Sequence, residues 1–341
     1  MNPKPFISVV CPVYNEERFI DGLVHSIVSQ DYPKDRMEVL IVDGRSCDKT
    51  KERVESYIRE YPFISLYDNP LCYVPHALNI GIENARGEVV IRLDAHCVYP
   101  SDYFSVLVQR LFEMDADNVG GVWRTVPADG SDKALALAVA SSNSFGVGNS
   151  FHKTGIASVR QVDTVPFGCF RRDLFDRIGF FDEDLIRNQD DEFNARIIQA
   201  GGRIFLLPEL EITYTARGSL SKMAKTYFQY GLFKPLVNKK IKHPATLRQF
   251  VPVLFVAGLI FGLPLSVFLP FAAKVYAACF SLYILVSLLV SLKQAVGHKK
   301  PVLFFLLPVV FFLMHFCYGC GYWKGLWKIA TGGKFSVGES R

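Results

Sequence analysis

Short runs of β-branched and apolar residues alternate with segments of helical period along the first part of the chain. The runs cover residues 7–11, 39–42, 64–67 and 89–93, and the segments of helical period cover 19–29, 49–60 and 75–85. Strands that alternate with helices predict a largely parallel α/β sheet. Because ligands of such sheets bind at the carboxyl ends of the strands, we expect the chemistry of this chain in the residues that follow each run.

The last third of the chain is strongly apolar. Its three apolar stretches each approach the roughly twenty residues that a helix needs to cross a bilayer, and they lie near 250–272, 275–292 and 302–322. We therefore predict three regions, which are a catalytic domain over 1–217, an interfacial amphipathic helix with a basic linker over 218–248, and a membrane region over 249–341. For the helix near 219–236, an ordinary core helix with a lysine-rich solvent face is the alternative.

The formal net charge is +5, and the Lys and Arg residues gather around the apolar stretches. They form no basic stripe with interleaved aromatic residues, so the expected partner is a membrane and not nucleic acid. Positive charge before the first stretch and after the second places the globular part and the loop 293–300 in the cytosol. The chain is thus predicted to be a multi-pass protein of the cell (inner or plasma) membrane with a cytosolic catalytic domain. Eight cysteines without framework spacing fit a reducing cytosol.

The third apolar stretch conflicts with this charge pattern. If it crossed the membrane, it would export a tail that carries Lys324, Lys328, Lys334 and Arg341, against the usual bias. A half-inserted or re-entrant segment therefore stays open as the alternative.

Polar side chains follow the first two predicted strands. Pro12, Tyr14 and Glu16 come after the first strand, and Asp43 follows the second. Neither loop has the glycine triad of a dinucleotide site or the Gly-Lys-Ser/Thr of a P-loop. Carboxylates can still hold a nucleoside, because they accept hydrogen bonds from base N–H and ribose O–H groups. The structural alternative is a turn at Asp43 and a helix cap at Asp48.

The fourth predicted strand runs into Asp94-Ala95-His96. Alternate positions of a strand face the same side, so the carboxylate and the imidazole can meet at one divalent cation that bridges a diphosphate. Imidazole is an uncommon ligand of Mg²⁺, so the pair favours Mn²⁺ over Mg²⁺.

Three consecutive carboxylates, Asp190, Asp191 and Glu192, precede a predicted helical stretch. Consecutive residues of a helix point in different directions, so only one of the three is expected to face a cleft. The alternative is that all three only complement the helix dipole.

Taken in order, these pieces resemble family 2 glycosyltransferases of the GT-A fold over roughly residues 5–234. The resemblance rests on Pro12-Val13-Tyr14-Asn15-Glu16, Asp43-Gly44-x-Ser46-x-Asp48-x-Thr50, Asn79 through Ala85-x-Gly87, Asp94-Ala95-His96, Gly168 with Arg171, Gly179-Phe180-Phe181-Asp182-Glu183, and Asp190 with Glu192 and Arg196. The Asp-Ala-His form, the later Gln229-Tyr230-Gly231 with Lys234, and the apolar tail resemble the membrane-associated glycosyltransferases of succinoglycan-type exopolysaccharide assembly. The Gln-x-x-Arg-Trp motif of processive synthases is missing from the sequence, which favours a single-addition enzyme.

The resemblance implies a mixed, mostly parallel GT-A sheet flanked by helices, followed by a C-terminal transmembrane helical region. By the same resemblance each site residue has a role: Asp43 contacts the base, Asp94 the ribose and the metal, His96 the metal, Pro12, Tyr14 and Glu16 wall the nucleotide site, and Asp190 is the general base. Gly168, Asp191 and Arg196 are assigned to the acceptor or sugar side. The family usually has Asp where His96 stands and Glu where Gln189 stands. The first departure bears on the identity of the metal, and the second removes a negative charge beside the base.

The expected reaction is the inverting transfer of a sugar from a nucleotide diphosphate donor, a UDP-sugar, to an acceptor hydroxyl with the help of a divalent cation. The implied acceptor is a lipid-linked saccharide in exopolysaccharide or cell-surface glycan synthesis. Two alternatives stay open, a polyprenyl-phosphate glycosyltransferase and a non-catalytic membrane subunit that keeps the fold. A nucleotide-dependent dehydrogenase is the weakest reading, because the glycine fingerprint is missing.

Overall fold

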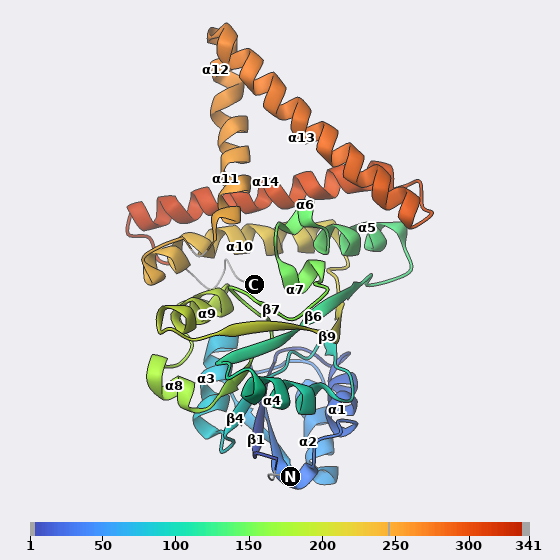
Figure 1. Ribbon diagram of the computed structural model, residues 1–341, viewed down its shortest axis with the longest axis vertical. Coiled ribbons are helices and arrows are strands. Elements are labelled where there is room, and N and C mark those ends of the chain that lie inside the picture. The colour runs from blue at the N-terminus through green and yellow to red at the C-terminus, as the bar shows by residue number, and fades with distance from the viewer. Residues whose placement is uncertain (1–3, 245, 336–341) are drawn as a thin grey trace. The chain divides into compact units, whose positions relative to one another are not determined.

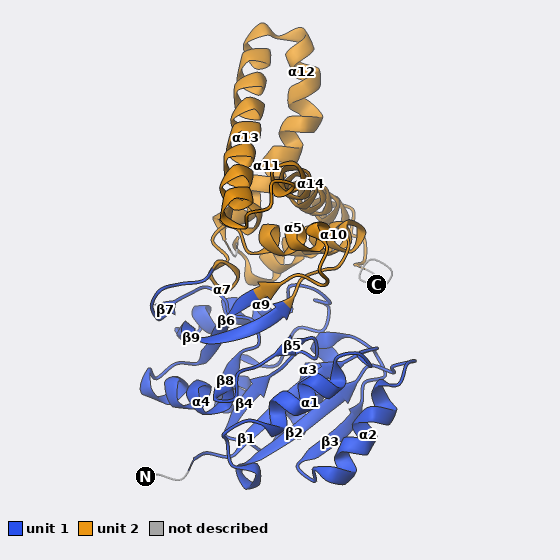
Figure 2. Cartoon of the chain, turned by 90° about the vertical axis from the view of Figure 1, so that its right-hand side faces the viewer, with its two compact units in different colours: residues 1–124, 155–214 blue, residues 125–154, 215–341 orange. Residues whose placement is uncertain are grey.

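The computed structural model describes residues 4–244 and 246–335. The chain divides into two compact units, unit 1 with residues 1–124 and 155–214, and unit 2 with residues 125–154 and 215–341 (Figure 2). Residues 125–154 fall inside the predicted domain 1–217, but in the structure they pack with the C-terminal part. Arg341, which enters the charge argument above, lies outside the described residues.

Unit 1 is built on a mixed sheet (Figure 1). Among the residues that the structure describes, nine strands form it in the order β3-β2-β1-β4-β8-β6-β9-β5, with β7 paired to β9. The strands are β1 (Ile7–Val13), β2 (Met37–Asp43), β3 (Ile64–Asp68), β4 (Val89–Arg92), β5 (Cys97–Val98), β6 (Asn118–Val126), β7 (Arg160–Gln161), β8 (Cys169–Arg171) and β9 (Ile204–Thr215). The first four pair in parallel, and β8 joins β4 antiparallel.

Helices connect the parallel strands. They are α1 (Ile20–Val28), α2 (Thr50–Glu60) and α3 (Val74–Asn84), with a short 3₁₀ turn at Lys34–Arg36. Later in unit 1 come α4 (Tyr103–Glu113), α8 (Asp173–Ile178) and α9 (Gln189–Gln199), which follow strands that pair antiparallel. The predicted α/β alternation of the first part of the chain is confirmed, and each predicted strand or helix there ends within two residues of its observed bounds.

The sheet is covered on both faces, which explains the continuous apolar runs of its central strands. Every residue of β2 is buried, and Ile7, Val9 and Cys11 of β1 belong to the main hydrophobic core. Strands buried on both faces need no alternation of apolar and polar residues. A Cβ atom on Gly81 of α3 would lie 2.3 Å from Val10, so this helix can approach β1 closely only with glycine here.

Unit 2 is helical. Its helices are α5 (Asp132–Ser141), α6 (Ser144–Val147), α7 (Phe151–Thr154), α10 (Leu220–Ile241), α11 (Phe250–Ala257), α12 (Leu263–Phe268), α13 (Pro270–Gly297) and α14 (Leu303–Ala330), with a 3₁₀ turn at Leu247–Gln249 and a π-helical turn at Gly258–Gly262. Among the described residues, three helical segments are long and apolar enough to cross a membrane, and they are Leu247–Phe268, Pro270–Gly297 and Leu303–Ala330. They coincide with the three predicted apolar stretches.

Candidate active site

A pocket opens at the carboxyl ends of β1, β2 and β4, beside the start of α3. Pro12, Tyr14, Glu16, Asp94 and His96, all predicted site residues, line it together. Val13, Gly44 and Ala95, which belong to the motifs quoted above, also line the pocket. Sequence reasoning missed the rest of its wall, which is Asn69, Cys72, Tyr73, Val74 and Ala77. The pocket lies where ligands of parallel sheets bind, because the strand order reverses around β1 and leaves a crevice between the loops.

Asp94 and His96 lie in a turn, and not in the strand from which their common direction was predicted. Strand β4 ends at Arg92, two residues earlier. The Tyr99 hydroxyl holds the turn, since it accepts the Asp94 N–H at 2.8 Å and donates to the Asp94 carbonyl oxygen at 3.2 Å. Both side chains still line the same pocket. Their common direction therefore comes from the turn and not from alternate positions of a strand.

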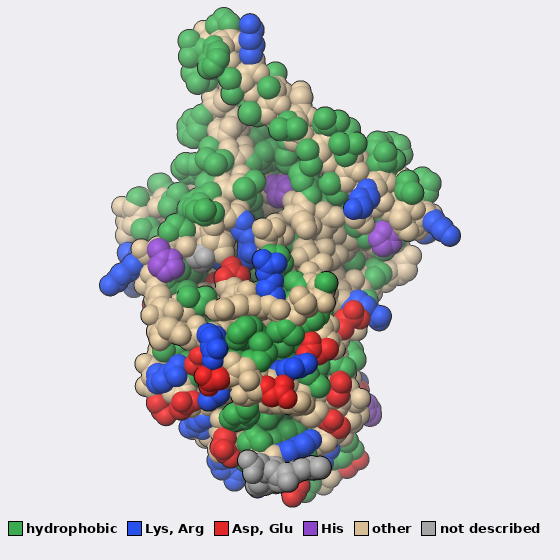
Figure 3. All heavy atoms as spheres, viewed as in Figure 1, with side chains coloured by type: hydrophobic (Ala, Val, Ile, Leu, Met, Phe, Trp, Pro, Cys, Tyr) green, Lys and Arg blue, Asp and Glu red, His purple; other side chains and the backbone are tan. Residues whose placement is uncertain are grey.

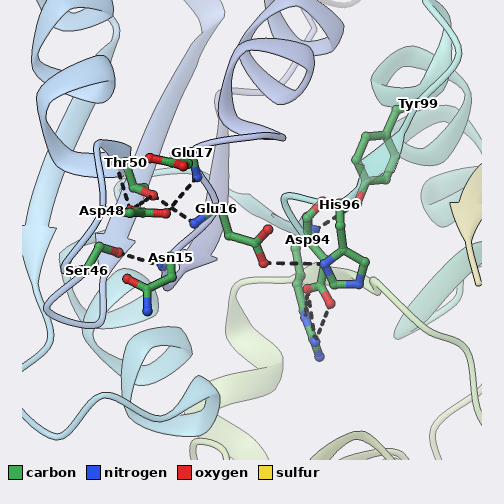
Figure 4. Close-up of polar contacts among 10 residues, drawn as sticks. Asn15, Glu16, Glu17, Ser46, Asp48, Thr50, Asp94, His96 and Tyr99 are labelled. Atoms are coloured by element: carbon green, nitrogen blue, oxygen red, sulfur yellow. Dashed lines mark hydrogen bonds and ion pairs between the residues drawn. The ribbon is translucent and has the colours of Figure 1, made fainter. Parts of the chain in front are cut away.

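His96 points at a carboxylate from the first strand loop (Figure 4). Its Nδ1 lies 3.6 Å from Oε1 of Glu16, and the Phe19 and Tyr214 rings flank the imidazole edge-on. In the described ranges 4–244 and 246–335, no group of three His, Cys, Asp or Glu is arranged to hold a metal ion. A cation at Asp94 and His96 would therefore need further ligands from a bound molecule.

Arg92 connects the pocket to the start of α9. Its side chain is only 6% exposed, and its Nε lies 3.1 Å from Oδ1 of Asp94. Its Nη1 donates to Oδ1 of Asp190, the second residue of α9. The predicted base and a carboxylate of the pocket thus share one buried guanidinium, although Asp190 itself does not line the pocket.

The charges of this cluster oppose one another. Burial raises the pKa of Asp190 to about 6, helped by the nearby Asp94 and Asp191 and opposed by Arg92. Burial acts to lower the pKa of Arg92, but the two carboxylates beside it outweigh that effect and raise it. Arg92 therefore stays charged, while Asp190 can gain and lose a proton near neutral pH, which suits a general base.

The polar side chains of the loop after β2 form hydrogen bonds within this loop and with the loop after β1. Ser46 donates to the buried Asp43 carboxylate from its N–H at 3.1 Å and from its hydroxyl at 2.6 Å. Asp48 accepts bonds from Thr50 N–H at 3.0 Å and from Glu17 N–H at 3.1 Å (Figure 4). The turn is therefore present, but the N-cap of α2 is Lys49, and Asp48, one residue earlier, binds the N–H of the first helical residue, Thr50. The pocket wall at this loop is Gly44. Contact between Asp43 and a nucleotide base stays a prediction.

The residues assigned to the acceptor side are placed as follows. The Gly168 carbonyl oxygen accepts the Arg92 N–H at 3.0 Å, and a Cβ atom on Gly168 would lie 2.3 Å from the Phe170 ring. Arg196 pairs with Glu192 at 2.7 Å and donates to the Phe180 carbonyl oxygen. These contacts hold the fold together, and Asp191 lies half-buried beside Asp190 in the first turn of α9. An acceptor role for any of the three stays a prediction.

Arg92 is the functional residue that sequence reasoning missed. It follows Val89, Val90 and Ile91 in a fully buried strand. A charge in such a strand is almost never left without a partner, so Arg92 was itself a signal that a carboxylate had to lie nearby. The sequence could not say that this partner lies 98 residues further along the chain.

The chain matches the family model described as Glycosyl transferase family 2 over residues 8–179. It is 30% identical over 325 residues to the succinoglycan biosynthesis protein ExoA of Rhizobium meliloti, covering 93% of this chain and 94% of that protein. It is also 28% identical over 332 residues to the dolichyl N-acetyl-alpha-D-glucosaminyl phosphate 3-beta-D-2,3-diacetamido-2,3-dideoxy-beta-D-glucuronosyltransferase of Methanococcus voltae, covering 95% of this chain and 98% of that protein.

Two solved structures share the fold. One is the mannosyltransferase PcManGT from Pyrobaculum calidifontis in complex with GDP-Man and Mn²⁺, with a TM-score of 0.60 and 23% identity over 96% of this chain and 88% of that one. The other is residues 1–349 of S. aureus TarS in complex with UDP-GlcNAc, with a TM-score of 0.52 and 19% identity over 97% of this chain and 93% of that one. At these identities the likeness establishes the GT-A architecture.

Proposed function

The chain belongs to glycosyl transferase family 2, and from this premise we propose that it transfers a sugar from a UDP-sugar to a hydroxyl of a lipid-linked saccharide, with inversion at the anomeric carbon. The observation that carries the proposal is the buried Arg92, which holds both a carboxylate of the pocket and the carboxylate at the start of α9. One guanidinium thus brings the donor side and the base side of a transfer reaction together.

The donor occupies the pocket in this proposal. Pro12, Tyr14 and Glu16 wall the nucleotide, and Asp94 accepts hydrogen bonds from the ribose. Gly44 lines the pocket next to Asp43, and a Cβ atom there would be in ordinary contact with the Tyr14 ring at 3.4 Å. Asp43 itself does not line the pocket, so its contact with the base would need the loop to shift.

The donor set fits a divalent cation that arrives with the diphosphate. Asp94 would supply a carboxylate and His96 an imidazole in one pocket, and the remaining ligands would have to come from outside the described residues. An imidazole ligand favours Mn²⁺ over Mg²⁺. When bound, the cation offsets the negative charge of the departing diphosphate as a Lewis acid.

Asp190 acts as the base. It takes the proton of the acceptor hydroxyl while that oxygen bonds to the anomeric carbon and the bond from this carbon to the diphosphate oxygen breaks on the opposite face. Arg92 is a positioning residue, since it fixes the Asp190 carboxylate and stays charged throughout.

The acceptor part of the proposal is supported by the membrane region and by the relatives. Three helical segments could cross a membrane, and the name of the relative from Methanococcus voltae contains dolichyl N-acetyl-alpha-D-glucosaminyl phosphate, a lipid-linked sugar phosphate. Confinement of enzyme and lipid-linked acceptor to one membrane raises their effective concentration.

The test uses the full chain in detergent or nanodiscs. A panel of nucleotide sugars is titrated with Mn²⁺ or Mg²⁺, and the tightest donor is assayed with a lipid-linked saccharide and with polyprenyl phosphate as acceptors. We expect a UDP-sugar, the lipid-linked saccharide and a product of inverted anomeric configuration. Transfer to polyprenyl phosphate alone would establish the first alternative, and donor binding without transfer to any acceptor would point to a non-catalytic subunit.

A further inference from the structure

Two helices of unit 2, α10 and α14, lie against each other along most of their length. Figures 1 and 2 both show them side by side, with α11–α12 and α13 projecting away from the pair. Glycines remove the side chains between the two backbones. A Cβ atom on Gly231 would lie 2.0 Å from the Tyr318 carbonyl oxygen, one on Gly321 2.1 Å from that of Phe228, and one on Gly325 2.3 Å from that of Leu232. Backbones in such contact must lie at the same depth in a membrane.

Helix α10 is too polar to lie in the hydrocarbon core. It carries Lys222 and Lys225 near its start, Lys234 in its second half, and Lys239 and Lys240 at its end. A charged side chain at the centre of a bilayer is costly and rare. Among the described residues, the segments apolar enough to cross a membrane do not include α10. If α14 crossed the membrane, it would take these lysines with it.

Helix α14 is apolar on two opposite faces. The face that packs against the other helices of unit 2 carries the buried residues Leu307, Phe311, Met314 and Tyr322. The other face carries an exposed stripe at spacings of three, four and seven residues, formed by Phe305, Val309, Phe312, Phe316, Trp323 and Trp327. An exposed stripe that ends in tryptophans next to lysines is typical of a helix that lies in the membrane interface.

Several contacts of α14 with the hairpin of α11–α12 and α13 lie near the two feet of that hairpin, and others reach higher, where the Tyr283 hydroxyl of α13 lies 3.1 Å from Nδ1 of His315. The Trp323 indole donates to the Val253 carbonyl oxygen at 3.2 Å, near the start of α11. Ala295, near the end of α13, shares a buried cluster with Leu303. Hydrophobic side chains cover much of the hairpin surface beyond the feet (Figure 3). A hairpin in the bilayer would thus place α14 at the surface from which the hairpin enters.

We propose that α10 and α14 lie together in the cytosolic interface of an anionic phospholipid membrane, with the stripe of α14 on the acyl chains, and that only the hairpin of α11–α12 and α13 crosses. Lys222, Lys225, Lys324 and Lys328 then face the lipid head groups, where each positive charge is attracted to anionic lipid. The arrangement also removes the conflict in the charge pattern, because the tail with Lys334 stays on the cytosolic side together with the loop 293–300.

The first test maps the sidedness of three positions. In a full-length chain without its native cysteines, Lys274→Cys, Lys299→Cys and Lys334→Cys are labelled with a membrane-impermeant maleimide in right-side-out spheroplasts and in inverted vesicles. We expect Lys274→Cys to react only in spheroplasts, and Lys299→Cys and Lys334→Cys only in inverted vesicles. Labelling of Lys334→Cys from outside would overturn the interfacial position of α14, and labelling of Lys274→Cys from inside would overturn the crossing of the hairpin.

The second test measures how deep α14 lies in the membrane. It does not depend on cysteine labelling, so it still decides the question if a cysteine variant reacts poorly. Phe316 lies midway along α14, so a Phe316→Trp chain with Trp123, Trp323 and Trp327 replaced by Phe reports the depth of the helix centre. In nanodiscs, bromines placed shallow in the acyl chains should quench its fluorescence more than bromines placed deep. The reverse order would mean that α14 crosses the bilayer. Neither test depends on sugar transfer. A failure of the interfacial position of α14 can therefore be distinguished from a failure of the proposed function.

Discussion

Two groups of carboxylates in unit 1 are held in different ways. In the loop after β2, Asp43 and Asp48 receive hydrogen bonds from Ser46 and Thr50, which lie two or three residues away. In the cluster at the pocket, Asp94 and Asp190 share Arg92, and Asp190 lies 98 residues from it. The first group is satisfied mostly within its own loop, with one further bond to Asp48 from Glu17 N–H of the loop after β1, whereas the second depends on a residue pair far apart in sequence.

This difference separates a structural carboxylate from a reactive one. Burial acts to raise the pKa of Asp48, but hydrogen bonds from Thr50 and Glu17 outweigh it and lower that pKa. Burial and two neighbouring carboxylates raise the pKa of Asp190 to about 6 in spite of Arg92. Donors that stabilise the ionised form suit a structural carboxylate, while a carboxylate among other carboxylates keeps its affinity for a proton.

The largest effect is expected at Asp190. Asp190→Asn keeps size and most hydrogen bonding but removes the basic carboxylate, so transfer should fall by about 10² to 10⁴-fold while donor affinity stays nearly unchanged. Asp191→Asn is the matched control, because a helix turns about 100° per residue and Asp191 should point away. Steady-state kinetics and donor titration measure both, and equal losses in the two variants would leave the base unassigned.

Arg92→Met tests whether the cluster depends on one guanidinium. Removing one partner of a buried ion pair costs roughly 3–5 kcal/mol, and since the Asp190 side chain is 32% exposed we expect the lower end of that range. Thermal unfolding in detergent measures it, with Arg124→Met as control at a surface pair with Glu211, in which both side chains are more than half exposed and loss of the pair should cost little. Equal stability of Arg92→Met and the parent chain would show that the pair does not hold the cluster.

The pH dependence should separate the two groups. Asp190 is an active carboxylate above its pKa of about 6, so kcat/KM should fall about tenfold per pH unit below that value. The lowered pKa of Asp48 keeps its bonds intact until the pH falls below 3.8, so unfolding of the loop cannot cause this fall. Arg92→Met should move the acidic limb to higher pH, because Arg92 opposes protonation of Asp190. A limb that stays in place would contradict that link.

His96→Ala should weaken activation by Mn²⁺ without a loss of fold. The imidazole is 24% exposed at the pocket edge, so its removal leaves the core intact. We expect the Mn²⁺ concentration for half-maximal activity to rise roughly tenfold, which corresponds to about 1.4 kcal/mol. His96→Asp, which restores the carboxylate common in the family, should recover much of the loss. Full activity of the parent chain in excess chelator would exclude a metal role for His96.

The smallest effect is expected in the loop after β2. Asp48→Ala removes the acceptor of the Thr50 N–H and should destabilise the chain by about 1 kcal/mol, as loss of one intramolecular hydrogen bond does. Glu52→Ala, in the first turn of the same helix, is the control and should change little. Thermal unfolding measures both. A strong loss of transfer by Asp48→Ala at unchanged stability would mean that the loop is part of the reaction.

Much of the candidate site was predictable because it follows strand ends. Pro12, Tyr14, Glu16, Asp94 and His96 line one pocket, as expected of residues at the carboxyl edge of a parallel sheet. The loop at Asp48 was predictable in part, since its bonds with Thr50 lie within one turn, whereas its bond from Glu17 N–H comes from the loop after β1. Local spacing therefore gave the positions, but it did not distinguish a structural carboxylate from a ligand.

The sequence by itself determined the elements whose signal is local, namely the buried strands, the helices between them and the three apolar helices. Only the tertiary structure decided that Arg92 joins Asp94 to Asp190, that residues 125–154 pack in unit 2, and that α14 lies along α10. The reason is that the hydrophobic periodicity of a strand or helix can be recognised from residues that are neighbours in the sequence. An ion pair between distant residues and a contact between two glycine-bearing helices depend on how the chain packs, which no short window of the sequence records.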